Sequence, residues 1–262
     1  MIFQTRVEIR KASFEIMPTD RLLFVGSCFA DNMGKRFVDN MFRAVTNPYG
    51  VMYNPASIMH TIDKVSESFD VVVLTLGTNH VYILKETGQI VDNCRKMPQK
   101  LFEECELTVD ECEGYLRKAM QRLRERNADV KVIITVSPIR YAKYGYHGSR
   151  LSKATLLLAA ERLVKDGGVE YFPAYEIMND ELRDYRFYEP DMLHPSTQAV
   201  DYIYERFKEV FFSKDATQME KEWQPISQAL RHRPFSPESE EYRSFLEKAK
   251  NDEQRFIEKW RL

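Results

Sequence analysis

The segment Arg21–Ala30 constrains the fold most, because it predicts a buried strand that stops abruptly and leads at once into a helix. Leu22–Val25 is a short apolar run typical of a strand covered on both faces, and Gly26 ends it. From Cys28 onward, apolar residues recur at helical spacing. Ser27 therefore lies where an open parallel sheet binds its ligands and where helix N–H groups favour negative charge. This position suits a nucleophile, a phosphate-binding loop or a turn that only needs small residues.

Strands and helices alternate along most of the chain. Continuous β-branched runs and shorter apolar runs predict strands at residues 22–25, 43–46, 70–76, 130–136 and 169–172. This alternation predicts a parallel sheet of about five strands with helices on both faces. Right-handed crossovers favour the doubly wound, flavodoxin-like order of a three-layer α/β/α fold. A hairpin over 81–91 and an edge strand at 4–9 are also expected.

The composition changes after Phe212. Residues 213–262 hold ten Lys/Arg and ten Asp/Glu, so the segment is far more charged than a domain core allows. Two helical patterns follow, and the second places Tyr242, Phe256 and Trp260 on roughly one stripe. We therefore divide the chain into a domain over 1–212 and a charged helical extension over 213–262. The stripe is expected to pack on the domain or on a partner subunit, which allows a homodimer through these helices.

Charge and cysteine spacing argue against several classes of partner. The 262 residues carry a formal net charge of −2, so no global field attracts nucleic acid or an anionic membrane. No apolar segment is long enough to span a bilayer, and the N-terminus lacks the apolar core of a signal peptide, so a cytoplasmic location is expected. Irregular spacing favours reduced thiols over a zinc site or a disulfide for Cys28, Cys94, Cys105 and Cys112.

Polar residues follow three of the predicted strands, and the carboxyl ends of parallel strands meet at one rim. Ser27 follows the first strand, Asn79 the third, and Asp191-Met-Leu-His194 precedes the closing helix. A carboxylate three residues before a histidine can orient the imidazole, which can then take a proton from Ser27. Asn79 can donate its amide N–H to an oxyanion. Each residue alone also suits a cap or a turn; their convergence favours a catalytic site.

These residues resemble a known family. Gly26-Ser-Cys-Phe-Ala30 resembles the signature of GSCFA-domain proteins, which are similar to the SGNH (GDSL-like) hydrolase superfamily. Ser27, Gly50, Gly77-Thr-Asn79 and Asp191-Met-Leu-His194 match the four blocks of that superfamily in order, over roughly residues 20–212. The chain departs from the pattern at two places. Val25-Gly26-Ser27 replaces the usual Gly-Asp-Ser, and His80 stands where an aspartate often follows the asparagine.

The resemblance implies a serine-dependent ester hydrolase without metal or organic cofactor. Ser27 would attack the ester, and His194, oriented by Asp191, would serve as base and then as acid. The backbone N–H groups of Ser27 and Gly50, with the Asn79 amide, would hold the oxyanion. An O-acyl ester of a carbohydrate is the implied substrate, with acetyl as the favoured acyl group. An O-acyltransferase with the same site and a non-catalytic sugar- or anion-binding module are the alternatives.

Other residues near the predicted rim are weaker candidates. His80, Arg140 and His147 are expected to bind substrate, although a loop histidine or a structural salt bridge also explains them. Cys28 is intrinsically the better nucleophile, yet we expect its side chain to point into the packing between helix and sheet. A phosphate-binding loop is disfavoured, because the turn has a single glycine and no P-loop lysine.

Overall fold

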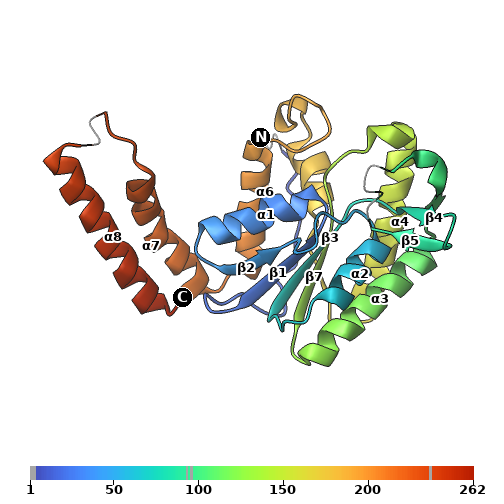
Figure 1. Cartoon of the computed structure of the whole chain (residues 1–262), viewed down its shortest axis with the longest axis horizontal. Helices are drawn as coiled ribbons and strands as arrows, with labels where there is room; N and C mark the ends of the chain where they lie inside the picture. Colours follow the sequence, from blue (N-terminus) through green and yellow to red (C-terminus); the bar gives the residue numbers. More distant parts are fainter. Residues whose placement is uncertain (1–3, 93, 95–96, 236–237) are drawn as a thin grey trace.

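A parallel sheet of five strands forms the centre of the computed structural model, which describes residues 4–92, 94, 97–235 and 238–262 (Figure 1). The strands are β1 (Arg21–Gly26), β2 (Arg43–Thr46), β3 (Val71–Leu76), β7 (Lys131–Val136) and β8 (Glu170–Tyr171). Their spatial order is β2-β1-β3-β7-β8, with every neighbouring pair parallel. This is the doubly wound order, so the predicted fold is confirmed.

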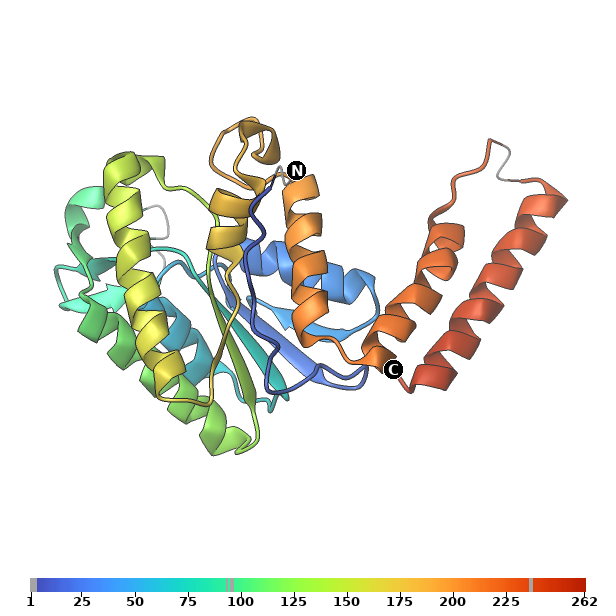
Figure 2. The ribbon, with the colours of Figure 1, turned by 180° about the vertical axis from the view of Figure 1, so that it is seen from behind.

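Helices cover both faces of this sheet (Figures 1 and 2). They are α1 (Cys28–Asp39), α2 (Pro55–Lys64), α3 (Val109–Arg126), α4 (Gly145–Lys165) and α6 (Thr197–Phe211). Because successive side chains of a strand point to opposite faces of the sheet, β1 contributes residues to the apolar core on each face. Leu22 and Phe24 pack under α1 and α6, and Leu23 and Val25 pack under α2, α3 and α4.

A second, antiparallel sheet leaves the main one after β3. It contains β4 (His80–Leu84), β5 (Gln89–Val91) and β6 (Phe102–Glu106) in the order β5-β4-β6. The predicted hairpin is confirmed as β4 and β5, but β6 was not expected, because three of its five residues are glutamates. The short helical segments are η1 (Gln99–Leu101), η2 (Ala142–Tyr144), α5 (Ala174–Glu176), the π-helical η3 (Ile177–Leu182) and η4 (Tyr185–Phe187).

The edge strand expected at 4–9 is wrong. This segment forms no ladder with any strand of the described chain. Side chains hold it instead: the Val7 N–H donates to Glu181, and the Arg206 guanidinium donates to the Val7 carbonyl. The alternating apolar residues of this segment therefore do not indicate a strand. Its backbone forms hydrogen bonds with side chains of other elements.

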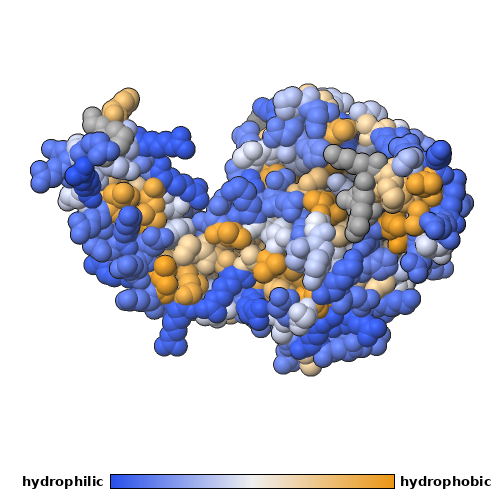
Figure 3. All heavy atoms as spheres, viewed as in Figure 1, coloured by the Kyte–Doolittle hydropathy of each residue, from blue (hydrophilic) through white to orange (hydrophobic). Residues whose placement is uncertain are grey.

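The chain after α6 forms a helical hairpin, α7 (Lys214–Arg231) and α8 (Glu240–Trp260), that projects from the β2 side of the domain (Figures 1 and 2). The Trp223 ring lies 5.1 Å from the Phe256 ring, and its Nε1 donates a 2.7 Å hydrogen bond to the Asp39 carbonyl at the end of α1. Apolar residues gather on the inner side of the hairpin and where it meets the domain (Figure 3). No helix in the described residues is both long and apolar enough to cross a membrane.

Candidate active site

The turn after β1 fixes the geometry of the site. Gly26 has φ of +145°, and a Cβ there would lie 2.1 Å from the Thr75 carbonyl oxygen, so only glycine fits. Ser27 follows as the N-cap of α1 and is fully buried. Its Oγ accepts a 3.3 Å hydrogen bond from the Phe29 N–H and lies 3.4 Å from Thr75 Oγ1. The Ser27 hydroxyl is therefore engaged in capping the helix.

Cys28, the first residue inside α1, is the side chain that meets the histidine. Its Sγ lies 3.6 Å from His194 Nε2, a hydrogen-bonding distance for sulfur. No hydrogen bond joins Ser27 to His194 in the described residues: the serine hydroxyl caps α1, and Cys28 Sγ contacts the imidazole. As expected, Cys28 packs against the apolar cluster between α1 and the sheet, but it is only half-buried and its Sγ also reaches the imidazole.

Asp191 and His194 form the predicted pair. Asp191 Oδ2 lies 2.6 Å from His194 Nδ1, and its Oδ1 accepts backbone N–H groups of Leu193 and His194 at 2.8 and 3.0 Å. These hydrogen bonds, led by the two backbone donors, lower the Asp191 pKa to about 2. Because the carboxylate only accepts, Nδ1 donates to it, and Nε2 is the ring nitrogen that faces Cys28.

Burial raises the pKa of the Cys28 thiol, and the carboxylates of Asp31 and Asp191 add to this effect. The resting thiol is therefore neutral at pH 7, since an unperturbed cysteine already titrates near 8.5. Such a thiol needs a base to become a nucleophile. His194 Nε2 is the base within reach.

The two groups expected to complete an oxyanion hole have other partners. The Gly50 N–H donates a 2.8 Å hydrogen bond to the Asn47 carbonyl within an exposed turn. The Asn79 side-chain amide donates a 2.8 Å hydrogen bond to the Leu107 carbonyl. Both groups thus donate to backbone carbonyls in this structure. The Cys28 N–H has no acceptor in another described residue.

Tyr141 is a site residue that the sequence did not suggest. Its hydroxyl is buried and has no hydrogen-bond partner among the described residues. A Cβ at Gly77 would lie 2.5 Å from this hydroxyl and 3.4 Å from the Ser27 Cβ, so the missing side chain of Gly77 makes room for it beside the turn. Burial, with a smaller effect of the nearby Cys28, raises the Tyr141 pKa, so the hydroxyl keeps its proton. A neutral, unpartnered donor at this place can bind an oxyanion.

Lys153 lies beneath the same rim. Its fully buried ammonium donates hydrogen bonds of 2.6 and 2.7 Å to the carbonyls of Gly77 and Ser137, at the ends of β3 and β7. Burial lowers its pKa to about 7. The burial of Lys153 was not predicted, because a lysine on a helix is ordinarily exposed.

His80 lies on the wall of a cleft of about 450 Å³ that also has Tyr53, Tyr141 and Tyr144 on its walls. The His80 ring stacks on Tyr144 with centroids 3.5 Å apart and planes 3° apart, and burial lowers its pKa, so it is neutral at pH 7. This is a suitable place for the predicted substrate contact. His147, by contrast, is exposed in the first turn of α4. It lines neither this cleft nor the pocket beside Arg140 and Arg150.

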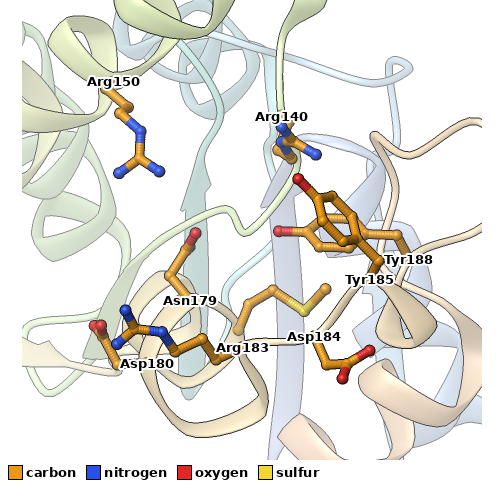
Figure 4. Close-up of a pocket in the computed structure, with 9 residues that line it drawn as sticks. Arg140, Arg150, Asn179, Asp180, Arg183, Asp184, Tyr185 and Tyr188 are labelled. Carbon is orange, nitrogen blue, oxygen red and sulfur yellow. The ribbon is translucent and has the colours of Figure 1, made fainter.

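Arg140 lies between a second pocket and the loop that carries Asp191 and His194. Its backbone N–H and Nη1 donate 3.0 Å hydrogen bonds to the carbonyls of Leu193 and Met192, directly before His194. The pocket has a volume of about 330 Å³ and lies between α4 and the segment after β8 (Figure 4). Arg140 was expected to bind substrate, and its position beside the His194 loop is consistent with that role.

Comparisons with solved structures identify the fold. The chain is similar to an acetyl-xylooligosaccharide esterase variant from Geobacillus stearmophilus, with 14% identity and a TM-score of 0.51 over 77% of this chain and 98% of that one. A protein from Parabacteroides merdae described as a GDSL-like lipase gives 12% identity and a TM-score of 0.51 over 79% and 99% of the two chains. At these identities the likeness shows the fold alone. No protein among the curated sequences matches the chain.

Family models cover most of the sequence. The model described as the GSCFA family matches residues 21–69 and 60–207, which contain the turn after β1 and the Asp191–His194 pair. The model described as the C-terminal domain of GSCFA domain proteins matches residues 223–261, which contain the second half of α7 and all of α8. The predicted resemblance is thereby confirmed, and the chain belongs to the GSCFA family.

Proposed function

We propose that the chain is an acyl-ester hydrolase in which Cys28 is the nucleophile, His194 the general base and Asp191 the residue that orients the histidine. One observation carries this proposal. Cys28 Sγ, the His194 imidazole and the Asp191 carboxylate are joined by contacts of 3.6 and 2.6 Å at the rim of the sheet. A nucleophile, a base and an orienting group in this order are typical of covalent acyl transfer.

The reaction uses two acyl transfers. In the first, His194 Nε2 takes the thiol proton as Cys28 Sγ attacks the carbonyl carbon, and the carbonyl electrons move to the oxygen. The ester C–O bond then breaks, the imidazolium protonates the leaving alcohol, and a thioester remains on Cys28. In the second, a water molecule attacks the thioester while His194 takes a proton from it, and His194 then returns that proton to the departing Cys28 thiolate. The acyl group leaves as its acid.

Two donors are available for the oxyanion. The Cys28 N–H lies at the first turn of α1, where the helix dipole favours negative charge. The unpartnered Tyr141 hydroxyl supplies a second donor. In this proposal they take the role first expected of Gly50 and Asn79, and Ser27 keeps its role as the helix cap.

The sequence supports Cys28 over Ser27 once the motif is aligned on its glycine. Gly26-Ser27-Cys28-Phe29 then stands opposite Gly-Asp-Ser-Leu, with the cysteine in the place of the serine. When Ser27 is instead placed opposite the serine of Gly-Asp-Ser, Gly26 is one residue away from the glycine of that motif; aligning the two glycines removes this mismatch. Thiol and hydroxyl nucleophiles use the same histidine base, so the exchange keeps the reaction class.

We propose an O-acyl ester of a carbohydrate as the substrate, with acetyl as the favoured acyl group. The cleft lined by His80 supports a sugar, because the rings of Tyr53, Tyr141 and Tyr144 give it flat, amphipathic walls. One similar structure is an acetyl-xylooligosaccharide esterase, which supports the same class by analogy of fold. The acyl group is small in this proposal, because the turn around Cys28 is closely packed.

Release of acid from 4-nitrophenyl acetate and from acetylated xylooligosaccharides tests the proposal. Cys28→Ala should lower turnover at least about 10³-fold, and mass spectrometry of the parent quenched during turnover should find the acyl group on the peptide that contains Cys28. Ser27→Ala is the matched control: it should lose about 1 kcal/mol of stability as a lost cap and retain most of the turnover. Loss of turnover in Ser27→Ala with activity retained in Cys28→Ala would reverse the assignment.

A further inference from the structure

The pocket beside the catalytic loop carries an unusual set of charges. Three arginines line it, Arg140, Arg150 and Arg183, together with the carboxylates of Asp180 and Asp184. Figure 4 shows Arg140 and Arg150 along one side of the pocket, whereas Arg183 lies beside Asp180 on another. Arg140 and Arg150 therefore lie on a different side of the pocket from Asp180 and Arg183.

Arg140 is held in a fixed orientation. Besides its two hydrogen bonds to the catalytic loop, its guanidinium lies 4.2 Å from the Tyr146 ring centroid and 5.3 Å from that of Tyr188. Contacts of this kind fix a guanidinium without neutralising it. Neither Arg140 nor Arg150 forms an ion pair with a carboxylate in the part of the chain that the structure describes.

At one end of the pocket, the charged side chains are all basic. Arg140, Arg150 and Asn179 also line an adjoining cavity of about 50 Å³, and Lys153 lies on its wall. No acidic residue lines this inner cavity. At the outer end, by contrast, Asp184 accepts a 2.9 Å hydrogen bond from the Arg186 N–H and lies 3.6 Å from its guanidinium. The acidic groups thus have basic neighbours, whereas Arg140 and Arg150 have no anionic partner in the described residues.

We propose that this pocket binds an anionic group of the substrate, so that the enzyme acts on acyl esters that carry a carboxylate or a similar anion. The inference rests on the proposed function, since the pocket adjoins the loop of Asp191 and His194. Guanidinium groups bind carboxylates through paired, charge-assisted hydrogen bonds. Arg140 and Arg150 line the same two cavities, and an anion bound there would reduce the repulsion between their like charges.

Matched esters that differ only in charge test this assignment. On the acyl side, 4-nitrophenyl hemisuccinate is compared with 4-nitrophenyl methyl succinate. On the alcohol side, acetylated glucuronic acid is compared with acetylated glucose. The parent should favour the anionic member of one pair by about tenfold or more in kcat/KM, the usual effect of one charged hydrogen bond, and the pair that responds identifies the side that carries the anion.

Arg150→Gln should lower that ratio of kcat/KM values by about tenfold. Arg243→Gln is the matched control, because it removes an equal charge from exposed α8, and it should keep the parent ratio. A parent that hydrolyses the neutral esters but shows no preference in either pair overturns the inference and leaves the proposed function intact. A parent that hydrolyses none of the esters overturns the proposed function.

A binding measurement separates the two results. Succinate should raise the melting temperature of the parent more than its neutral diamide does at matched ionic strength, and Arg150→Gln should lose the difference. Equal shifts for succinate and the diamide in the parent would show that the pocket takes no carboxylate, whatever the enzyme hydrolyses.

Discussion

Ser27 and Cys28 are neighbours, and the backbone decides which of them meets His194. Ser27 has the extended backbone of an N-cap, with φ of −64° and ψ of 174°, which turns its hydroxyl back to the Phe29 N–H. Cys28 begins the helix, so its side chain leaves in another direction and reaches the imidazole. Sequence spacing does not separate two adjacent residues at a strand end. The cap geometry distinguishes them. In the sequence, the sign of that cap is a serine directly before an amphipathic helix.

The Tyr141 hydroxyl gives a prediction at the same scale. Tyr141→Phe should lower kcat about 10²–10³-fold, with a small change in KM, because a lost oxyanion donor acts mainly in the transition state. The ring and its packing remain, so the melting temperature should stay close to that of the parent. Steady-state kinetics and thermal unfolding measure both effects.

Asn79→Ala provides the contrasting variant. Its amide holds the Leu107 carbonyl, so we expect this change to lower stability by about 1–3 kcal/mol and to affect turnover less than Tyr141→Phe. The opposite pattern, with turnover lost in Asn79→Ala and kept in Tyr141→Phe, would return the oxyanion role to the asparagine.

At the scale of elements, the sequence predicts best what is periodic and local. All five parallel strands and the Asp191–His194 pair follow from apolar runs and residue spacing. The β6 strand and the burial of Lys153 do not, because both depend on tertiary partners. Glutamates suit β6 only because it pairs with β4 on an outer sheet. Lys153 can be buried only because two strand-end carbonyls accept hydrogen bonds from its ammonium group.

Lys153 makes stability depend on pH. Burial lowers its pKa from 10.5 to about 7. Well below pH 7 the Lys153 amine is protonated in both the folded and the unfolded chain. Between pH 7 and 10.5 it is largely deprotonated in the folded chain and still protonated in the unfolded chain, so the folded chain holds fewer protons. The free energy of unfolding contributed by this group therefore rises with pH across that window, by at most about 1.4 kcal/mol per pH unit.

Urea unfolding at several pH values, with Lys153→Met beside the parent, checks this expectation. The variant should lack the part of the rise that belongs to Lys153, so its slope should be smaller between pH 7 and 10. Lys221→Met removes an exposed lysine of α7 and should keep the parent slope. Equal slopes in all three proteins would mean that Lys153 titrates alike in the folded and unfolded states.

At the scale of the whole molecule, the candidate site and the helical hairpin lie at different ends of one core. The site occupies the carboxyl rim of the sheet, and α7 and α8 project from the β2 side (Figure 1). Even so, Ala216, Met219 and Trp223 of α7 belong to the same buried cluster as Phe37 of α1 and Phe207 of α6. The division at residue 212 therefore marks a change of composition, while the apolar packing continues across it.

This continuity predicts that the extension and the domain unfold together. Trp223→Ala removes a buried ring from the junction and its hydrogen bond to Asp39, so it should cost about 3–5 kcal/mol in a single urea transition. Trp260→Ala, at the half-buried end of α8, should cost less. Esterase kcat/KM should stay at the parent value in both variants, because neither residue reaches the rim. A transition in which α7 and α8 melt first, with the sheet keeping its parent midpoint, would instead make residues 213–262 an independent unit.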